Sequence, residues 1–288
     1  MSQQTTQQLV PLSSESVARG AVNALGGRTG RFARSGNAGW WTPLRVIITL
    51  AWTFLAFGFM SKATCAGSRR GDDGVISLNW DGNRQYTSFC YNDIVPLYGG
   101  RGLDEPGFPY AYSWVEGDLT RYMEYPVLAG LFQGAMGWLA RNTYAAVEWI
   151  GIADVSWYFG LTAFFMALMW VGVVVMVFQL TGNRAWDTIL VAASPLVVIH
   201  AFTNWDIPSV AFMVGALLAV TKRKNLLAGV LIGLGTAFKL WPLFILGAFL
   251  VLAMRNKRWA PFVTMFVSTI VTWGVVNLPV ALKYPEAW

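Results

Sequence analysis

The chain of 288 residues is too apolar for a water-soluble protein. Apolar residues make up 55% of it and charged residues only 12%, and its mean hydropathy is +0.47. This composition excludes a soluble enzyme, a secreted disulfide scaffold and a disordered chain, and it predicts an all-α, polytopic helical membrane protein. The formal net charge of +6 could indicate either a nucleic-acid-binding surface or basic connectors that set the orientation in a membrane. The positions of the basic residues along the chain distinguish the two.

Residues 1–43 are predicted to form a disordered basic tail on the cytoplasmic side, and residues 44–288 the transmembrane domain. The tail is rich in Gln, Ser, Thr and Gly, which cannot bury enough surface to offset the entropy of ordering. A first span is predicted from Val46 to Met60. The small residues at 62–66 would also suit a cleaved signal peptide, but the spans that follow favour an uncleaved anchor.

Six further apolar stretches bring the expected number of spans to about seven. They are 157–180, 186–202, 208–220, 226–240, 243–254 and 261–276. The connectors between them hold the remaining clustered basic residues, at Arg184, at 222–224 and at 255–258. If these connectors are cytoplasmic, the turns at 203–206 and 239–242 and the carboxyl end face outward.

The apolar stretch 125–140 does not fit this count, because a single crossing there would put every basic connector outside. We predict that it is a re-entrant or juxtamembrane helix at the outer face, or that it pairs with 144–156 as a short hairpin. Its glycines and Gln133 suit a close-packed, partly buried helix. The large outer loop 62–156 then has seven basic and eleven acidic residues, so no nucleic-acid partner is expected.

Cys65 and Cys90 both fall in this outer loop and are the chain's only cysteines. They could form a disulfide or stay free, and the sequence leaves both alternatives open. The single histidine, His200, has no Cys or His companion at ligand spacing, so no metal site is predicted and a structural hydrogen-bonding role is expected.

Two strings in the outer loop could carry acid–base chemistry. Asp93 lies in the string Tyr91-Asn92-Asp93-Ile94, where aromatic and apolar neighbours could make its carboxylate a general base. The alternative is an ordinary solvated loop aspartate. Arg121, Glu124 and Tyr125 precede the 125–140 helix, and they could line a site or simply begin the helix.

Three polar residues near the outer ends of spans add to this set. Asn204 and Asp206 lie in the 203–206 turn, and Lys239 ends a long apolar run. An ionisable group at membrane depth is a candidate for function, and a cation there suits a phosphate. Lys239 could instead extend to the interface without a ligand.

Taken together, these strings resemble the polyprenyl-phosphate-sugar-dependent glycosyltransferases of the GT-C superfamily. The closest resemblance is to the actinobacterial α-mannosyltransferase group (GT87-like). It rests on four motifs in order: Asp93 after the first span, Glu124-Tyr125-Pro126, Asn204-Trp205-Asp206, and Gly233 followed by Lys239-Leu240-Trp241-Pro242. The resemblance covers about residues 44–288.

The resemblance implies a multi-pass enzyme of the plasma membrane. Such an enzyme moves a sugar, usually mannose, from a polyprenyl-phosphate donor to a cell-envelope glycolipid or glycan on the outer face, with inversion. It implies that Asp93 is the general base and that Lys239 steadies the donor phosphate. The cavity would be lined by Asn92, Arg121, Glu124, Tyr125, Asn204 and Asp206. No cofactor is expected beyond this donor, and a divalent cation is left open because other superfamily members use one.

Two alternatives remain. Members of this group usually have several further spans, so the chain could be an inactive truncated homologue. It could also be a small-molecule or lipid transporter or scaffold, although the paired repeats typical of carriers are not evident.

Overall fold

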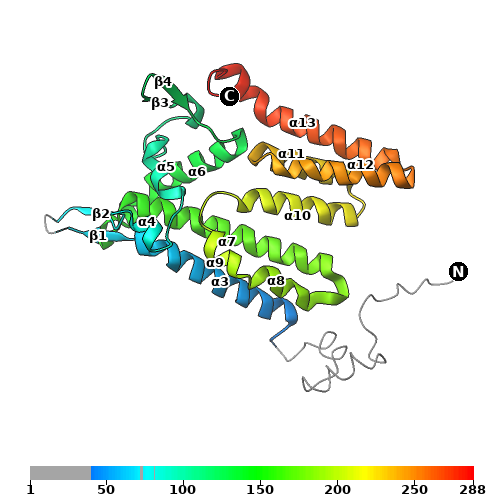
Figure 1. Ribbon diagram of the computed structural model, residues 1–288, viewed down its shortest axis with the longest axis horizontal. Coiled ribbons are helices and arrows are strands. Elements are labelled where there is room, and N and C mark those ends of the chain that lie inside the picture. The colour runs from blue at the N-terminus through cyan, green and yellow to red at the C-terminus, as the bar shows by residue number, and fades with distance from the viewer. Residues whose placement is uncertain (1–39, 72–73, 81) are drawn as a thin grey trace.

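The structure is a computed structural model that describes residues 40–71, 74–80 and 82–288, and it is mostly helical (Figure 1). The expected tail therefore lies almost entirely outside the described residues. The helices are α3 (Pro43–Ala66), α4 (Arg84–Thr87), α5 (Ile94–Gly100), α6 (Val127–Thr143), α7 (Asp154–Thr181), α8 (Ile189–Ala192), α9 (Pro195–His200), α10 (Ile207–Thr221), α11 (Asn225–Phe238), α12 (Ile245–Asn256) and α13 (Trp259–Lys283). Two antiparallel hairpins, β1–β2 (Ser68–Arg70 and Ile76–Leu78) and β3–β4 (Ser113–Glu116 and Leu119–Tyr122), complete the outer segment.

The long helices lie side by side and form a bundle with two distinct ends. At one end, on the right of Figure 1, α3 begins, and the α7–α8, α10–α11 and α12–α13 connectors gather there. These are the three basic connectors. At the other end lie the segment between α3 and α7, the α9–α10 turn, the α11–α12 turn and the carboxyl end. The basic connectors and the opposite turns therefore lie at the two ends of the bundle where the predicted spans place them.

Within the described residues, α3, α7 and α13 are long and apolar enough to cross a membrane. The helices α10 and α11 and the segment 241–256 are shorter but also apolar. The chain is thus an all-α membrane protein, as its composition predicts. The two hairpins were not predicted, because strands of three and four residues leave too short a pattern to detect.

The predicted span 186–202 is not one helix. The chain forms a 3₁₀ segment at Gly182–Thr188, then α8, then a break, then α9. Pro195 has no N–H to donate and restrains the residue before it, so the helix stops and restarts there, with the Ser194 hydroxyl accepting from the Leu196 N–H at 3.3 Å. The restarted helix runs close to α3, because a Cβ on Gly58 would lie only 3.2 Å from the Val197 carbonyl oxygen.

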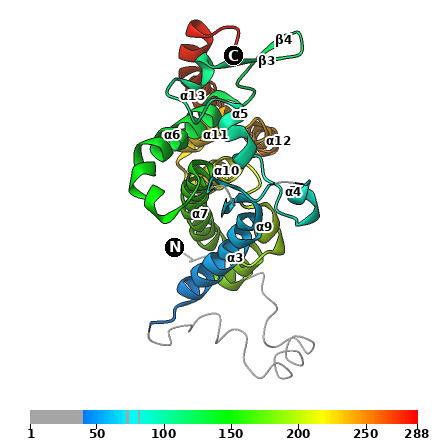
Figure 2. The same ribbon diagram turned by 90° about the vertical axis from the view of Figure 1, so that its left-hand side faces the viewer.

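Helix α6 lies across the outer end of the bundle and packs against α7, α11 and α13 (Figure 2). Its glycines let the outer loop approach closely: a Cβ on Gly137 would lie 2.5 Å from the Leu103 carbonyl oxygen, and Gly130 faces the Tyr110 ring. The segment 144–156 contains only 3₁₀ turns before α7 begins, so the alternative of a hairpin of two helices is wrong. The prediction that 125–140 does not cross singly agrees with this arrangement.

The helices α11 and α13 pack closely in the same way. Gly229 faces the carbonyl of Met265, and a Cβ on Gly233 would lie 2.7 Å from the carbonyl oxygen of Thr269. The Thr269 hydroxyl donates to the Gly229 carbonyl at 3.0 Å. The Gly229–Gly233 pair therefore serves close helix packing, as its four-residue spacing predicts.

Cys65, in the last turn of α3, is joined to Cys90 by a disulfide with a Cα–Cα distance of 5.9 Å. Both cysteines are fully buried. The bridge closes the segment that holds β1, β2 and α4. It fixes the start of the loop that leads to Asp93, immediately before α5.

We expect loss of this disulfide to destabilise the protein. The bridge spans 25 residues, and closing a loop of that size lowers the entropy of the unfolded chain by an amount worth about 3 kcal/mol. Adding a reductant, or replacing both cysteines by alanine, should therefore lower the thermal midpoint in lipid nanodiscs. The double alanine variant is the control, since a reductant should not shift its midpoint further. An unchanged midpoint for the reduced parent protein would contradict the prediction.

Candidate functional site

Hydrogen bonds from different parts of the chain fix the backbone of the loop that contains Asp93. Its own N–H donates to the Thr203 carbonyl at 2.7 Å, which ties the outer loop to the α9–α10 turn. One residue earlier, Asn92 is fully buried, and its side chain accepts from the Val95 N–H at 2.9 Å and donates to the Cys90 carbonyl at 3.2 Å. Asn92 thus caps α5 in this structure, and its contact with a substrate stays a prediction.

A lysine that sequence reasoning missed also holds this loop. Lys62 of α3 is only 3% exposed, and its ammonium donates to the Tyr91 carbonyl at 2.8 Å. Burial removes the water that would hydrate the ammonium, so the charge needs a hydrogen-bond acceptor from the protein in its place. It lies one helical turn before Cys65, so the disulfide and this hydrogen bond together fix residues 90–93. Nothing in the sequence distinguished Lys62 from other lysines near the end of a span.

The carboxylate of Asp93 is partly exposed and accepts a hydrogen bond from the Tyr91 hydroxyl at 2.6 Å. This hydrogen bond, with smaller contributions from burial and charge, raises the pKa of Tyr91 to about 12. The phenol therefore remains a donor throughout the physiological range. The Tyr91 hydroxyl thus binds one carboxylate oxygen of Asp93, and the other oxygen accepts no hydrogen bond from this phenol.

Tyr125 lies at the centre of the predicted site residues. Its backbone carbonyl accepts from the Tyr110 hydroxyl at 2.8 Å, and its ring meets the fully buried Trp205 edge to face at 5.3 Å. Burial raises the pKa of Tyr125, and the carboxylates of Asp93, Glu124 and Asp206 raise it further, while Arg101 acts in the opposite direction. The charges of Asp93 and Asp206, from distant parts of the chain, and of the adjacent Glu124 thus all act on this phenol.

Asp206 and Lys239 form an ion pair across the α9–α10 and α11–α12 turns. Asp206 precedes α10 and Lys239 follows α11, so each side chain stands at the outer end of its helix. The side chains are 46% and 26% exposed respectively, and such a pair contributes at most about 1 kcal/mol. Lys239 is therefore paired in the structure, and its contact with a donor phosphate stays a prediction.

Glu124 pairs with Arg101, a residue that sequence reasoning did not single out. The guanidinium donates from Nε to one carboxylate oxygen at 2.7 Å and from Nη2 to the other at 2.6 Å, which is a bidentate geometry. Arg101 also lies over the Trp114 ring at 4.1 Å. The two partners are 23 residues apart, so no local spacing could have revealed this pair.

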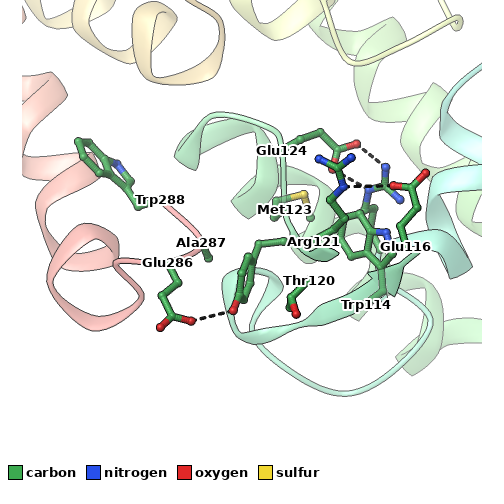
Figure 3. A pocket seen from close by; sticks show the side chains of 11 residues that line it. Trp114, Glu116, Thr120, Arg121, Met123, Glu124, Glu286, Ala287 and Trp288 are labelled. Carbon is green, nitrogen blue, oxygen red and sulfur yellow. Dashed lines mark hydrogen bonds and ion pairs between the residues drawn. The ribbon is translucent and has the colours of Figure 1, made fainter. Parts of the chain in front are cut away.

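Arg121 and Asn204 occupy the edges of the site. Arg121 lies on β4 and pairs with Glu116 of β3 at 3.2 Å, and Figure 3 shows this pair beside Glu124. Asn204 is partly exposed in the turn between Thr203 and Trp205. The 203–206 turn thus connects several of these residues: its Thr203 carbonyl accepts from the Asp93 N–H, its Trp205 ring contacts Tyr125, and its Asp206 pairs with Lys239. Arg121 lies on the hairpin, paired with Glu116.

A metal ion was left open by the sequence. Across residues 40–71, 74–80 and 82–288, no three His, Cys, Asp or Glu side chains come together to hold one. His200 is exposed at the end of α9. A divalent cation stays an open prediction, and we derive no chemical step through one.

Comparison with known proteins bears on the family. The model of glycosyltransferase family 87 matches residues 122–288, which is more than half of the chain. The match includes Glu124, Tyr125, Asp206 and Lys239, whereas Asp93 precedes it. No curated protein and no solved structure matches the chain. The chain therefore belongs to glycosyltransferase family 87 and is a transferase of the GT-C-like type.

Proposed function

We propose that this enzyme transfers mannose from a polyprenyl-phosphate donor to a hydroxyl of a cell-envelope glycolipid or glycan. The observation that carries the proposal is the position of Asp93, whose backbone N–H binds the carbonyl of Thr203 in the same turn that holds Asp206 and its partner Lys239. Family membership supplies the reaction type, which is the transfer of a sugar from a donor to an acceptor.

Asp93 would serve as the general base. The acceptor hydroxyl gives its proton to the carboxylate as its oxygen forms a bond to C1 of the donor sugar, on the face opposite the leaving phosphate. The bond between C1 and the phosphate oxygen breaks, and the phosphate leaves with the electron pair. The configuration at C1 is thereby inverted. Tyr91 orients one oxygen of the base and leaves the proton to be taken by the other.

Lys239 would bind the donor phosphate. In the structure it pairs with Asp206, and the phosphate would take the place of this carboxylate. Breaking the ion pair costs little free energy, because the side chains of Lys239 and Asp206 are both partly exposed. A cation beside the phosphate offsets the charge that develops as the bond to C1 breaks, which stabilises the transition state.

The same proposal gives the orientation in the membrane. The start of α3 and the three basic connectors share one end of the bundle, and basic connectors usually stay on the cytoplasmic side. We therefore infer a multi-pass protein of the plasma membrane with a cytoplasmic amino terminus. The site would then face the outer side, where the lipid-linked donor presents its sugar.

An assay of the full chain in lipid vesicles tests the proposed function. We expect mannose transfer to an extracted membrane-lipid acceptor from polyprenyl-phosphate mannose, but not from GDP-mannose in the absence of a polyprenyl phosphate. Polyprenyl-phosphate arabinose serves as the control for the sugar. Transfer directly from GDP-mannose would contradict the proposed donor, and exclusive use of arabinose would contradict the proposed sugar.

A further inference from the structure

An apolar groove of about 480 Å³ runs along the side of the bundle between α11 and α13. We call it the helix groove. Its aliphatic walls are Leu226 and Val230 of α11 and Val263, Val267 and Val271 of α13. Apart from Val230, these side chains are between 49% and 65% exposed, so the groove is open to the hydrocarbon of a bilayer. No residue of the candidate site lines it.

Two hydroxyl side chains in the helix groove do not make it a polar site. The Thr264 hydroxyl donates to the Ala260 carbonyl at 2.9 Å, and the Ser268 hydroxyl donates to the Thr264 carbonyl at 2.7 Å. Both carbonyls belong to α13 itself, so these hydroxyls are used within their own helix. The groove therefore suits a hydrocarbon chain better than a polar ligand.

The helix groove extends over one leaflet of a bilayer. Its lining on α13 begins at Val263, in the first two turns of the helix, and ends at Thr272. At the rise of an α-helix this distance is about 14 Å. The hydrocarbon core is about 30 Å thick, so the groove runs from the end where α11 and α13 begin to about the middle of the membrane. This length fits one chain of a lipid in that leaflet.

Exposed basic residues stand at the end of the helix groove where the two helices begin. Lys224 directly precedes α11 and Arg258 directly precedes α13. The helices are already in contact within their first two turns, because Gly229 faces Met265. The α10–α11 and α12–α13 connectors thus share one end of the bundle (Figure 1), and their exposed cations are Lys222, Arg223, Lys224, Arg255, Lys257 and Arg258.

None of these six cations forms an ion pair with another of the residues that the structure describes. Lys222 donates to the amide oxygen of Gln179 at 3.0 Å, which is a neutral partner. At this end of the bundle the acid within the described ranges is Asp187, and it pairs with Arg184 of the third basic connector. An excess of positive charge therefore remains beside the groove.

Two of the cations occupy a backbone conformation that favours glycine. Arg223, just after α10, has a φ of 58°, and Lys257, just after α12, has a φ of 53°. Glycine adopts this conformation without strain and is the usual residue where a helix ends in this way. Orientation in the membrane requires basic residues in a connector but not at this position. Arginine and lysine at strained positions therefore indicate a further role for their charges.

We propose that the helix groove binds an anionic phospholipid, with one of its chains between α11 and α13 and its phosphate among the connector cations. Basic residues beside a gap between membrane helices are typical of sites for anionic lipid headgroups. With the orientation proposed above, the lipid belongs to the cytoplasmic leaflet. Its site is separate from Asp93 and Lys239, which lie at the opposite end of the bundle, and does not depend on the proposed reaction.

A second copy of the chain fits the helix groove less well than a lipid does. Two copies in one membrane have the same orientation, so a copy seated on α13 would bring its own basic connectors to the same leaflet. Like charges facing one another oppose such an association. An anionic headgroup instead offsets the unpaired cations.

Native mass spectrometry of the full chain, released from detergent, tests the site. The probes are phosphatidylglycerol and phosphatidylcholine with identical chains, and glycerol 3-phosphate as a headgroup without chains. We expect phosphatidylglycerol to bind about tenfold more tightly than phosphatidylcholine, because several cations act on its phosphate without a compensating choline. High salt should reduce this preference. Glycerol 3-phosphate should not displace the lipid, because it cannot fill the apolar groove.

A charge variant tests the connectors. Arg223→Asn with Lys257→Asn removes two cations and supplies a residue that tolerates a positive φ, so both turns should stay intact. We expect this variant to lose the preference for phosphatidylglycerol. Arg69→Asn with Lys283→Asn is the matched control, since it removes two exposed cations from the other end of the bundle and should leave the preference unchanged.

A groove variant tests the chain site. Val267→Phe fills part of the helix groove and should weaken the binding of both lipids, whereas Val275→Phe, at an exposed position of the same helix outside the groove, should not. The proposal is overturned if the two lipids bind equally, if glycerol 3-phosphate displaces phosphatidylglycerol, or if neither variant differs from its control. It is also overturned if the chain is a dimer that takes up lipid only after it dissociates, because a second copy would then cover the groove.

Discussion

Asp93→Asn is expected to lower kcat/KM for sugar transfer by about 10²–10⁴-fold, the usual contribution of a positioned general base. An amide cannot take the proton of the acceptor hydroxyl, but its oxygen can still accept the hydrogen bond from Tyr91. The backbone N–H that donates to Thr203 is also retained. The variant should therefore keep its fold and its affinity for the donor while it loses the chemical step.

Initial rates with polyprenyl-phosphate mannose, together with the thermal midpoint, measure this loss. Asp104→Asn is the matched control, because Asp104 is an exposed aspartate of the same outer segment that stands outside the site, and it should transfer at the parent rate. If Asp93→Asn transferred sugar as fast as the parent, Asp93 would not be the base. The neighbouring acids Glu124 and Asp206 would then be the residues to replace next.

Lys239→Met is expected to lower kcat/KM for the donor by about 10²–10³-fold, the usual cost of removing one group that stabilises developing charge. Two effects add here. The phosphate loses its cation, and Asp206, which Lys239 neutralises in the structure, is left to repel it. The effect should weaken at high salt, because both side chains are partly exposed and screening acts on them.

A double variant separates these two effects. Lys239→Met with Asp206→Asn removes the repelling charge as well, so it should recover about tenfold of the lost kcat/KM for the donor. Lys283→Met is the matched control, since Lys283 ends α13 at the same end of the bundle and lies over the Tyr284 ring. Equal donor kinetics for Lys239→Met and Lys283→Met would mean that Lys239 has no role at the phosphate.

The helical architecture could be predicted because hydropathy is a local property. The expected spans overlap α3, α7, α10, α11, α12 and α13. The spacing of Gly229 and Gly233 indicated close helix packing, and the structure shows that the partner helix is α13. The segment 186–202 was the exception. Its apolar composition predicted a span, but one proline without an N–H and its preceding serine divide it into separate helices.

The counting of charged connectors predicted a feature that hydropathy alone would have missed. A window over 125–140 looks like a span, yet α6 lies across the outer end of the bundle. The contacts that hold it there, Gly130 against Tyr110 and Gly137 against the Leu103 carbonyl, come from the outer loop. The sequence indicated that α6 should not cross, whereas the partners that cover its close-packed face could not be deduced.

The sequence indicated which residues could belong to the site, but not how they are arranged in space. Asp93, Tyr125 and Asp206 were chosen from three separate short strings, and the structure connects them through the 203–206 turn. Arg101, Trp114 and Lys62 were missed, because their roles arise from partners 23, 13 and 29 residues away along the chain or from burial that no local pattern reports.

Composition and periodicity determined by themselves that this protein is a helical membrane protein, because the free energy of burying apolar side chains depends on the residues alone. The order of basic connectors determined which turns share an end of the bundle. Only the tertiary structure decided that Lys239 pairs with Asp206, that the Asp93 N–H binds the Thr203 carbonyl and that Arg101 pairs with Glu124. These features depend on distances between segments far apart in sequence, and such distances are set by packing rather than by any single stretch of residues.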